Sequence, residues 1–192
     1  ALVGESGAGK TTFLNIASLM LATTDGEVCI DGQFVRPGES YKERVIGYCG
    51  QSAYVFNATI AENVTMKDLS EITAYDHEYV NALLARLGLA GGKRSNNLDS
   101  NIVVGAGGVQ LSGGEKQRIS IARMMFCKAE INFLDESTSA LDSATEEMVL
   151  SELFKELREV MVLFITHRKG PLKFCNRVIK FDNGKLIKIE DC

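Results

Sequence analysis

The chain opens with a short apolar segment, and hydrophobic residues then recur at helical spacing. Residues 1–3 predict the end of a buried strand, and the pattern after Lys10 predicts a helix. The positions expected on the inner face of this helix are Phe13, Ile16, Ala17, Met20 and Leu21. A natural start would seldom leave a core strand at a bare terminus, so we expect the protein to continue upstream of Ala1.

The following segments predict β-structure first and helices afterwards. Residues 27–35, interrupted by Asp31-Gly32, predict a hairpin, and residues 45–49 predict a short strand. From Asn57 to Ser112 the pattern changes to helices with Gly- and Asn-rich connections. One helical face there is expected to consist of Val80, Leu83, Leu84 and Leu87.

Helices and strands alternate in the second half of the chain. We expect helices at 115–127 and about 143–157, strands at 131–134 and 160–165, and a terminal hairpin of 177–182 and 185–190 around Asn183-Gly184. The positions expected to face inward are Ile119, Ala122, Met125, Phe126, Met148, Leu153 and Leu157, and those expected in solvent are Lys116, Arg118 and Arg123. This alternation predicts an α/β protein with a mostly parallel sheet covered on both faces.

Length, net charge and cysteine content limit the kinds of partner and compartment that the sequence favours. At 192 residues the chain is about one domain, which can bury roughly 70% of its unfolded surface. A net charge of -4 gives no broad basic field, so no nucleic-acid partner is expected. The five cysteines are scattered without metal spacing, which favours a reduced compartment, and no apolar run approaches the ~18 to 20 residues of a membrane span. Any membrane domain is therefore expected elsewhere.

Residues 4–11, Gly-Glu-Ser-Gly-Ala-Gly-Lys-Thr, match the phosphate-binding loop G-x-x-x-x-G-K-[ST]. Glycines allow successive backbone N–H groups to point inward, and the following helix presents its positive end to the same anion. Lys10 is expected to hold the β- and γ-phosphates of a nucleotide, and the Thr11 hydroxyl to bind Mg²⁺. The alternative is a Gly-rich turn with a solvated lysine.

Two adjacent carboxylates, Asp135 and Glu136, end the apolar run that begins at Ile131. Asp135 is placed to reach the metal through a water, and Glu136 to act as general base on the attacking water. Alternatively, the pair could cap the helix that begins near Ser143.

Ser112-Gly113-Gly114 stands just before a predicted helix and supplies a hydroxyl, two unhindered amides and a helix dipole for an anion. The alternative is an ordinary N-cap in which Ser112 satisfies the first turn. A second phosphate-binding element in one small domain is hard to use on a single nucleotide.

The phosphate loop, the segment Leu111-Ser112-Gly113-Gly114-Glu115 and the acidic strand end occur in the order that resembles the nucleotide-binding domain of ABC (ATP-binding cassette) transporters. The resemblance implies the P-loop NTPase fold of ABC ATPases, with a small antiparallel β region. It also implies a RecA-like core of about 1–50 and 113–192 and a helical subdomain of about 57–112. The chain departs from the family pattern at Ala106, Glu115 and Ser137.

The resemblance also implies roles for individual residues. The signature Ser112-Gly113-Gly114 would complete the nucleotide site of a second subunit in a head-to-tail dimer, and Asp142 is the D-loop aspartate. Gln51 joins the metal site to the transmembrane domains, and His167 contacts the γ-phosphate. The residues implied to bind ATP are Gly4, Glu5, Ser6, Gly7, Ala8, Gly9, Lys10, Thr11, Thr12, Ser112, Gly113, Gly114 and Asp142. Those implied for Mg²⁺ are Thr11, Gln51 and Asp135, and those for catalysis are Glu136, His167 and Gln51.

Residues 52–64, after Gln51, resemble the corresponding segment of ABC exporters. The expected function is therefore ATP hydrolysis that drives export, at the cytoplasmic face of a membrane, with transmembrane domains as partners. A simpler interpretation of the segment is a loop followed by a helix capped by Asn57 or Thr59. Two other functions remain open: a soluble ABC ATPase and a nucleotide-binding regulatory module without turnover.

Overall fold

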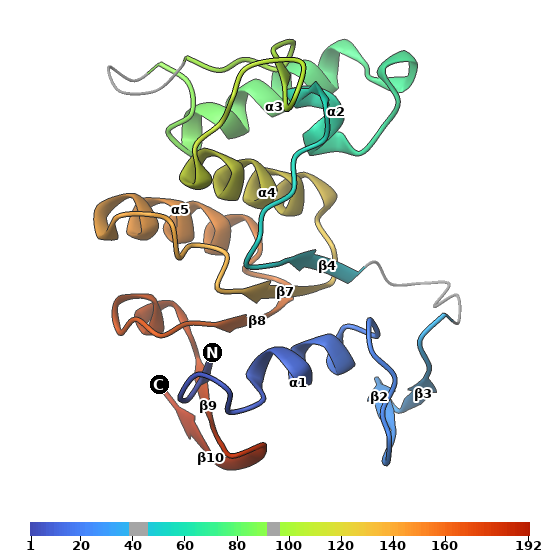
Figure 1. The fold of residues 1–192 in the computed structure, drawn as a ribbon, viewed down its shortest axis with the longest axis vertical. Helices are drawn as coiled ribbons and strands as arrows, with labels where there is room; N and C mark the ends of the chain where they lie inside the picture. Colours follow the sequence, from blue (N-terminus) through green and yellow to red (C-terminus); the bar gives the residue numbers. More distant parts are fainter. Residues whose placement is uncertain (39–45, 92–96) are drawn as a thin grey trace. The chain divides into compact units, whose positions relative to one another are not determined.

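A computed structural model describes residues 1–38, 46–91 and 97–192 (Figure 1). The chain divides into two compact units. The first consists of Ala1–Tyr48, Ala129–Glu136 and Val160–Cys192, and the second of Cys49–Lys128 and Ser137–Glu159. Val45, expected to begin a strand, lies outside the described residues.

Within the described residues, six strands of the first unit form one sheet in the order β10-β9-β1-β8-β7-β4. The strands are β1 (Leu2–Val3), β4 (Ile46–Cys49), β7 (Ile131–Asp135), β8 (Met161–Ile165), β9 (Arg177–Asp182) and β10 (Lys185–Asp191). Strand β1 pairs in parallel with both β8 and β9, and β7 pairs in parallel with β8. The predicted mostly parallel sheet is confirmed.

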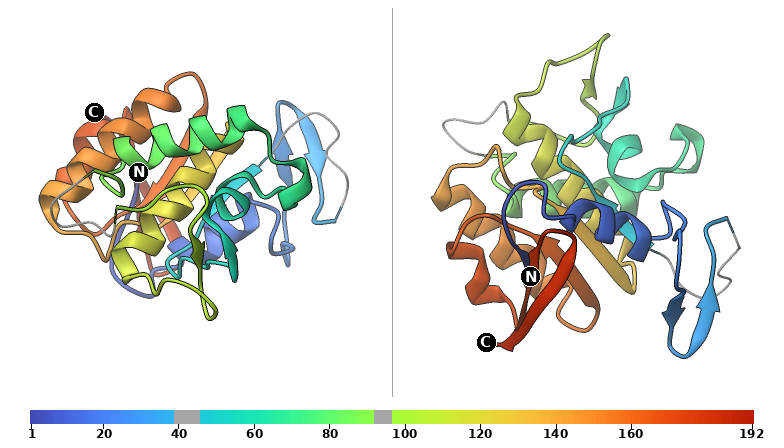
Figure 2. Two further views of the ribbon diagram at one scale, coloured as in Figure 1. Left: turned by 90° about the horizontal axis from the view of Figure 1, so that it is seen from above. Right: turned by 60° about the horizontal axis from the view of Figure 1, so that its bottom comes forward.

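Two hairpins of this unit form where the sequence predicts them. Strands β9 and β10 are antiparallel around Asn183 and Gly184, and β2 (Val28–Ile30) and β3 (Gln33–Val35) around Asp31 and Gly32. All four turn residues have positive φ, between 47° and 80°, as a two-residue type I′ hairpin requires. The right view of Figure 2 shows the β9–β10 hairpin beside the N-terminal strand β1, with which β9 pairs.

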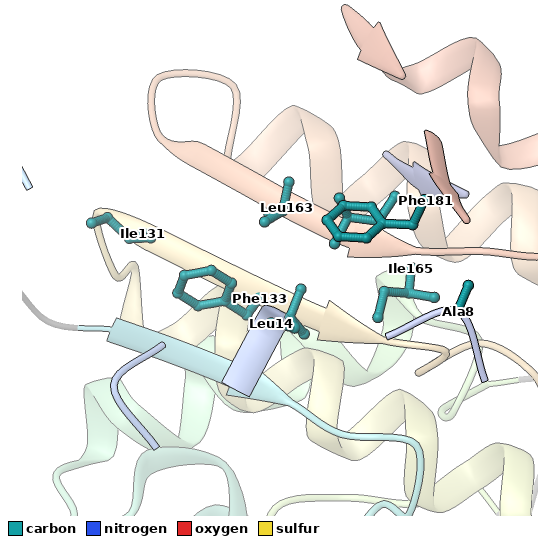
Figure 3. Close-up of a cluster of buried hydrophobic side chains, with 8 residues drawn as sticks. Ala8, Leu14, Ile131, Phe133, Leu163, Ile165 and Phe181 are labelled. Carbon is teal, nitrogen blue, oxygen red and sulfur yellow. The ribbon is translucent and has the colours of Figure 1, made fainter. Parts of the chain in front are cut away.

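The core of the first unit explains why the strands are so apolar. Every residue of β7 is buried, and Leu2 and Leu14 are fully inaccessible. Figure 3 shows the cluster, which contains Leu2, Ala8, Leu14, Ile131, Phe133, Leu163, Ile165 and Phe181. Helix α1 (Lys10–Ala17) contributes Leu14 to it, so the phosphate loop is fixed between a central strand and an anchored helix.

The expected length and inner face of this first helix are wrong at its end. Helix α1 stops at Ala17, Leu19 takes a left-handed conformation with φ 62°, and Met20 and Leu21 are 59% and 47% exposed. The fully buried apolar residue of α1 is Leu14, whereas Phe13 and Ala17, predicted on the inner face, are partly buried and pack against the core. A left-handed residue ends the helical repeat, so later apolar residues cannot continue its face.

The second unit contains mainly helices. Its elements are β5 (Ala58–Thr59), α2 (Ile60–Thr65), the 3₁₀ turn η1 (Leu69–Glu71), α3 (Ala74–Arg86), β6 (Val103–Val104), α4 (Gly113–Cys127) and α5 (Ser143–Glu156). Strands β5 and β6 pair antiparallel. The predicted face of Val80, Leu83, Leu84 and Leu87 is confirmed, since all four are fully buried. A further 3₁₀ turn, η2 (Gly170–Phe174), belongs to the first unit.

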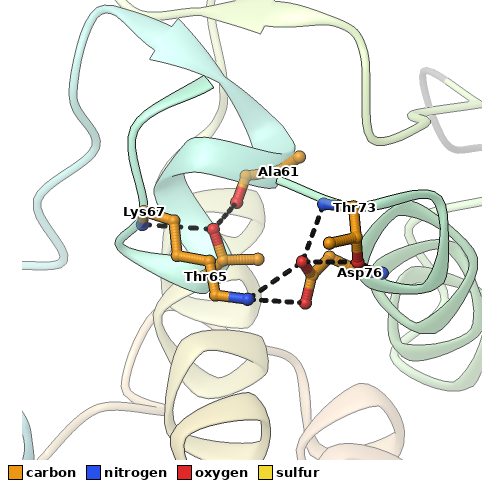
Figure 4. A network of polar contacts seen from close by, with 5 residues as sticks. All are labelled: Ala61, Thr65, Lys67, Thr73 and Asp76. Carbon is orange, nitrogen blue, oxygen red and sulfur yellow. Dashed lines mark hydrogen bonds and ion pairs between the residues drawn. The ribbon is translucent and has the colours of Figure 1, made fainter. Parts of the chain in front are cut away.

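Capping boxes fix the ends of the helices in the second unit. Thr59 caps α2 with Glu62, so Thr59 and not Asn57 is the cap. Thr73 caps α3 with Asp76, whose carboxylate also binds Lys67 Nζ at 2.9 Å through each oxygen (Figure 4). The backbone N–H of Thr73, followed by Lys67 and the Thr73 hydroxyl, lowers the pKa of Asp76 to about 2. The neighbouring Thr65 hydroxyl donates to Ala61 O at 2.8 Å.

Several side chains of α4 and α5 differ from expectation. Met148 is 37% exposed, whereas Leu153 and Leu157 are buried as predicted. Arg118 and Arg123, expected in solvent, are partly buried. Arg118 Nη1 donates to Gly88 O at 2.9 Å, and Arg123 Nε donates to Asn63 O at 2.8 Å. Burial lowers the pKa of both guanidinium groups. Long cationic side chains satisfy carbonyl groups at the ends of other helices here, which the local pattern does not encode.

The two compact units and the implied subdivision have different boundaries. Helices α4 and α5 lie in the second unit, whereas the family resemblance implies a core that includes residues 113–192. A compact unit of one chain and a subdomain shared by a family are defined differently, so the implied core is not tested by these units. The assignment of a helical subdomain to about 57–112 therefore stays a prediction.

Candidate functional site

The phosphate loop connects β1 to α1 and has the backbone that the motif predicts. Gly4, Gly7 and Gly9 have φ of 153°, 80° and 93°. A Cβ on Gly4 would stand 2.3 Å from Phe181 O, which explains why this position must be glycine. Gly9 is the N-cap of α1 and makes no side-chain capping bond, so the first turn of α1 keeps the arrangement of an anion site.

The β9–β10 hairpin contacts this loop through its turn residue Gly184. Gly184 N donates to Ala8 O at 3.0 Å, and a Cβ on Gly9 would approach Gly184 Cα to 3.4 Å. The amino-acid pattern does not connect residues 183–184 with the loop. Only the pairing of β9 with β1 brings them together, and no local signal could have shown it.

Lys10 is held across the loop and does not extend into solvent. Its side chain is 5% exposed, and Nζ donates to Gly4 O at 2.9 Å and Glu5 O at 2.7 Å. The ammonium group is therefore fixed beside the same backbone that would surround a phosphate. The alternative of a turn with a solvated lysine is wrong.

Thr11 and Asp135 come together from α1 and the end of β7. The Thr11 hydroxyl donates to Asp135 Oδ1 at 3.3 Å. Burial raises the pKa of Asp135, and the neighbouring Glu136 charge adds to this effect. The hydrogen bond from Thr11 and the charges of Lys10 and His167 act in the opposite direction. A further cation here would relieve the cost of the buried carboxylate.

The donor set fits a magnesium ion bound together with phosphates. In the parts of the chain that the structure describes, no group of three or more His, Cys, Asp or Glu side chains could hold a metal ion. A hydroxyl and one carboxylate are hard oxygen ligands of the kind Mg²⁺ prefers, and the ion commonly takes further ligands from substrate phosphates and water. Thr12 follows Thr11 in the first turn of α1 and is exposed.

Glu136 and His167 form a direct pair at the ends of neighbouring parallel strands. Strand β7 ends beside β8 with Asp135 opposite Ile165, and His167 Nε2 lies 2.7 Å from Glu136 Oε1. A carboxylate only accepts, so we assign the Nε2–H tautomer to His167. Glu136 has φ 48°, a left-handed conformation uncommon for a non-glycine residue and concentrated at functional sites.

The carboxylate that caps α5 belongs to the D-loop and not to the acidic pair Asp135 and Glu136. Asp142, and neither Asp135 nor Glu136, caps α5: its Oδ1 accepts from Ala144 N at 3.1 Å and Thr145 N at 3.0 Å. The Thr145 hydroxyl, which donates to Oδ2 at 2.7 Å, is the main cause of the lowered pKa of Asp142. Asp142 thus has a structural role, and its contact with nucleotide stays a prediction.

The signature residues lie in the second unit at the start of α4. Ser112 is the N-cap, and its Oγ donates to Glu115 Oε2 at 2.7 Å while accepting from Glu115 N at 3.3 Å. The capping alternative is therefore correct for the hydroxyl. Gln51 also lies in the second unit and is exposed. The phosphate loop, Asp135, Glu136 and His167 all belong to the first unit.

Comparison with known proteins agrees with this geometry. The family model described as ABC transporter matches residues 1–139. The ATP-dependent lipid A-core flippases of Vibrio vulnificus and Ralstonia nicotianae are each 34% identical to the chain over 98% of its length. The chain spans 32% of the length of these relatives.

Two solved structures cover 99% of the chain. A bacterial Atm1-family ABC exporter with ATP bound superposes with a TM-score of 0.84 at 29% identity, over 33% of that chain. A dimeric ATP-binding cassette in a post-hydrolysis state, bound to ADP and Pi, superposes with a TM-score of 0.77 at 28% identity, over 83% of that chain.

The parallel sheet, the phosphate loop after β1 and the acidic end of β7 define a P-loop NTPase of the ABC ATPase type. The chain belongs to the ABC transporter family and is an ATP-binding ATPase domain within it. The fold class and the family resemblance are confirmed. Within residues 1–38, 46–91 and 97–192, no helix combines the length and the apolarity that crossing a membrane requires.

Proposed function

We propose that the first unit binds Mg-ATP and hydrolyses the bond between its β- and γ-phosphates, and that the residues responsible form a single site. The observation that supports this most directly is that five side chains of the same unit come together there. Lys10 lies on the loop, Thr11 contacts Asp135 at 3.3 Å, and Glu136 contacts His167 at 2.7 Å. Each of these side chains comes from the end of a strand or the start of a helix, where ligands of parallel sheets bind.

The proposed roles follow from charge and reach. Backbone N–H groups of residues 4–12 and Lys10 hold the phosphates, and Thr11 and Asp135 hold Mg²⁺. The ion would neutralise charge on the β- and γ-phosphate oxygens. Glu136 accepts a proton from the attacking water as the water oxygen bonds to the γ-phosphorus and the bond to the β-phosphate oxygen breaks. His167 orients Glu136 and contacts the γ-phosphate.

Replacement of the general base tests this proposal. Glu136→Gln keeps the size and the acceptor oxygen toward His167 but cannot take the proton. We expect ATP affinity by calorimetry to be retained, and phosphate release to fall by ~10²-fold or more. Lys10→Ala is the contrasting variant, which should weaken ATP binding itself because the charge beside the phosphates is lost. Near-normal phosphate release by Glu136→Gln would remove Glu136 from this role.

We further propose that Ser112, Gly113 and Gly114 complete the nucleotide site of a second copy or a related domain. The start of α4 presents glycine amides and a helix dipole, and the similar cassette bound to ADP and Pi is dimeric. In a homodimer, Lys10→Ala and Ser112→Arg would each damage both sites. Mixing the two variants should restore tight ATP capture at one site per dimer. If verified mixed dimers capture no ATP, the two elements do not act across an interface.

The whole protein, we propose, uses this hydrolysis to drive export from the cytoplasmic face of a membrane. Relatives that are flippases are about three times longer than this chain, which leaves room for transmembrane domains, fused or separate. Gln51 and the segment 52–64 would then contact those domains. Fractionation of cells expressing the full-length protein should place it with membranes after a high-salt wash. Recovery in the soluble fraction would favour a soluble ABC ATPase.

A further inference from the structure

Gln117 is a buried polar residue on α4 that the roles described above do not use. Its side chain is 4% exposed, although both ends of its amide are hydrogen-bonded. Nε2 donates to Ser139 Oγ at 3.2 Å, and Oε1 accepts from Ala140 N at 3.0 Å. Both partners lie in the D-loop, Ser139–Asp142, about 20 residues further along the chain. Ser139, Ala140 and Asp142 of this loop are exposed.

The glycines of the signature make a second contact with the same loop. A Cβ on Gly114 would stand 3.2 Å from Leu141 Cδ2 and 3.4 Å from Ala140 O, and one on Gly113 would stand 3.6 Å from Ala140 Cβ. The D-loop backbone thus lies directly against the start of α4. Leu141 is 5% exposed and anchors the loop, while Asp142 begins α5.

We propose that Gln117 is a positioning residue that fixes the D-loop to the signature, so that both reach a partner's nucleotide site as one rigid element. The proposal rests on the proposed function of the signature. A two-point amide contact specifies both the distance and the direction of the D-loop relative to α4, which the apolar packing of Leu141 does not by itself specify. Misplacement of an orienting group by ~1 Å can reduce a rate by as much as ~10²-fold.

The exposure of Ser139 and Ala140 separates positioning from stability. Water can replace either hydrogen bond at these exposed residues, so loss of the Gln117 amide should leave the folded fraction at the assay temperature nearly unchanged. The orientation of the loop, in contrast, depends on the amide. If Gln117 only stabilises the fold, its loss should lower kcat no more than it lowers the fraction of folded protein. If Gln117 positions the D-loop, kcat should fall much further than the folded fraction.

The test uses Gln117→Met, which keeps the length and flexibility of the side chain and removes both hydrogen bonds, in the full-length protein. We expect kcat for ATP hydrolysis to fall on the order of 10-fold, KM for ATP to stay within about 3-fold, and backbone amides of 138–142 to exchange faster. Gln117→Glu should restore most of kcat because a carboxylate can accept from Ala140 N–H and from the Ser139 hydroxyl. Ser139→Ala, which keeps the Ala140 bond, should lie between the two.

Three results would overturn the proposal: unchanged kcat in Gln117→Met, no recovery in Gln117→Glu, or a fall in kcat fully matched by a fall in the fraction folded. Failure of the proposed function looks different. In that case the wild-type protein would release no phosphate, while faster exchange at 138–142 in Gln117→Met would still report the contact. A fourth result would also overturn the proposal: unchanged amide exchange at 138–142 in Gln117→Met, when the wild-type protein is active.

Discussion

Gly47 on β4 faces a buried amide with no room for a methyl group. A Cβ on Gly47 would stand 2.6 Å from Asn132 Oδ1 and 3.2 Å from Ala129 Cβ. Asn132 is fully buried on β7, and its Nδ2 donates to Ala129 O at 2.7 Å. Among the described residues, Oδ1 of Asn132 has no hydrogen-bond partner. We therefore predict that Gly47→Ala destabilises the protein and that Asn132→Ala rescues it.

The magnitude follows from the contact. Overpacking of a closed core costs ~1–3 kcal/mol, and replacing a strand glycine by alanine returns roughly 0.5–1 kcal/mol through backbone entropy. Gly47→Ala should therefore lower the free energy of unfolding by about 1 kcal/mol, and by at most about 2.5 kcal/mol. In Asn132→Ala the clash disappears together with the unpaired oxygen, which itself costs ~1–3 kcal/mol. The double variant should be more stable than the sum of the single effects by roughly 0.5–3 kcal/mol.

Urea unfolding followed by circular dichroism measures this double-mutant cycle. Gly170→Ala is the matched control, because a Cβ at Gly170 meets nothing within 4 Å and the residue has no positive φ. If Gly47→Ala behaved like Gly170→Ala, or if the two single effects at Gly47 and Asn132 were additive, the steric argument would be wrong.

Two further predictions concern pH. Burial raises the pKa of Asp135 in the folded state, so its contribution to stability falls as pH rises from the ordinary carboxyl range through the raised value. Asp135→Asn, which keeps an acceptor for Thr11, should gain in melting temperature relative to wild type as pH rises from 4 to 7; a difference independent of pH would contradict this. Asp76 has the opposite sign: hydrogen bonds hold its pKa at about 2, so its stabilisation is present above the ordinary carboxyl range and is lost as pH falls through about 2. Asp76→Asn should therefore melt lower than wild type at pH 7, and the gap should close in acid; a gap that persists at pH 2 would exclude the Asp76 carboxylate as its source.

The sequence could predict elements whose causes are local. The hairpin around Asn183-Gly184 needs two positive φ values, which these residue types supply cheaply, and the α3 face from Val80 to Leu87 follows one helical period. The prediction that Met20 and Met148 face inward is wrong, because their environment is not set locally. Their exposure depends on where a helix stops and on which neighbours cover it, and neither is encoded in spacing.

Motif order predicts Thr11, Asp135 and Glu136 as candidate site residues, because the proposed chemistry requires those residue types at those positions. It does not predict which side chains contact one another. That Glu136 meets His167 depends on β7 lying beside β8, which is a property of the tertiary pairing. The sequence does not predict the Gln117 contact, because Gln117 is one polar residue between Lys116 and Arg118, and its partners lie after the next strand.

The start of α4 shows why a capping interpretation and an anion-binding interpretation of Ser112 need not exclude each other. The capping box uses the Ser112 hydroxyl and the N–H of Glu115, and the first helical hydrogen bond runs from Lys116 N to Ser112 O at 3.0 Å. The N–H groups of Gly113 and Gly114 precede that bond in the first turn, where helix amides have no intrahelical acceptor. Because neither residue has a side chain, a phosphate can approach these amides without displacing the cap. The cap then orders the backbone that the proposed anion site requires, and the Glu115 carboxylate that completes the cap places a negative charge next to it. Binding of a second subunit's phosphate at Ser112 would have to compete with that charge, which makes Glu115 the departure from the family pattern with the most direct consequence for the proposed composite site.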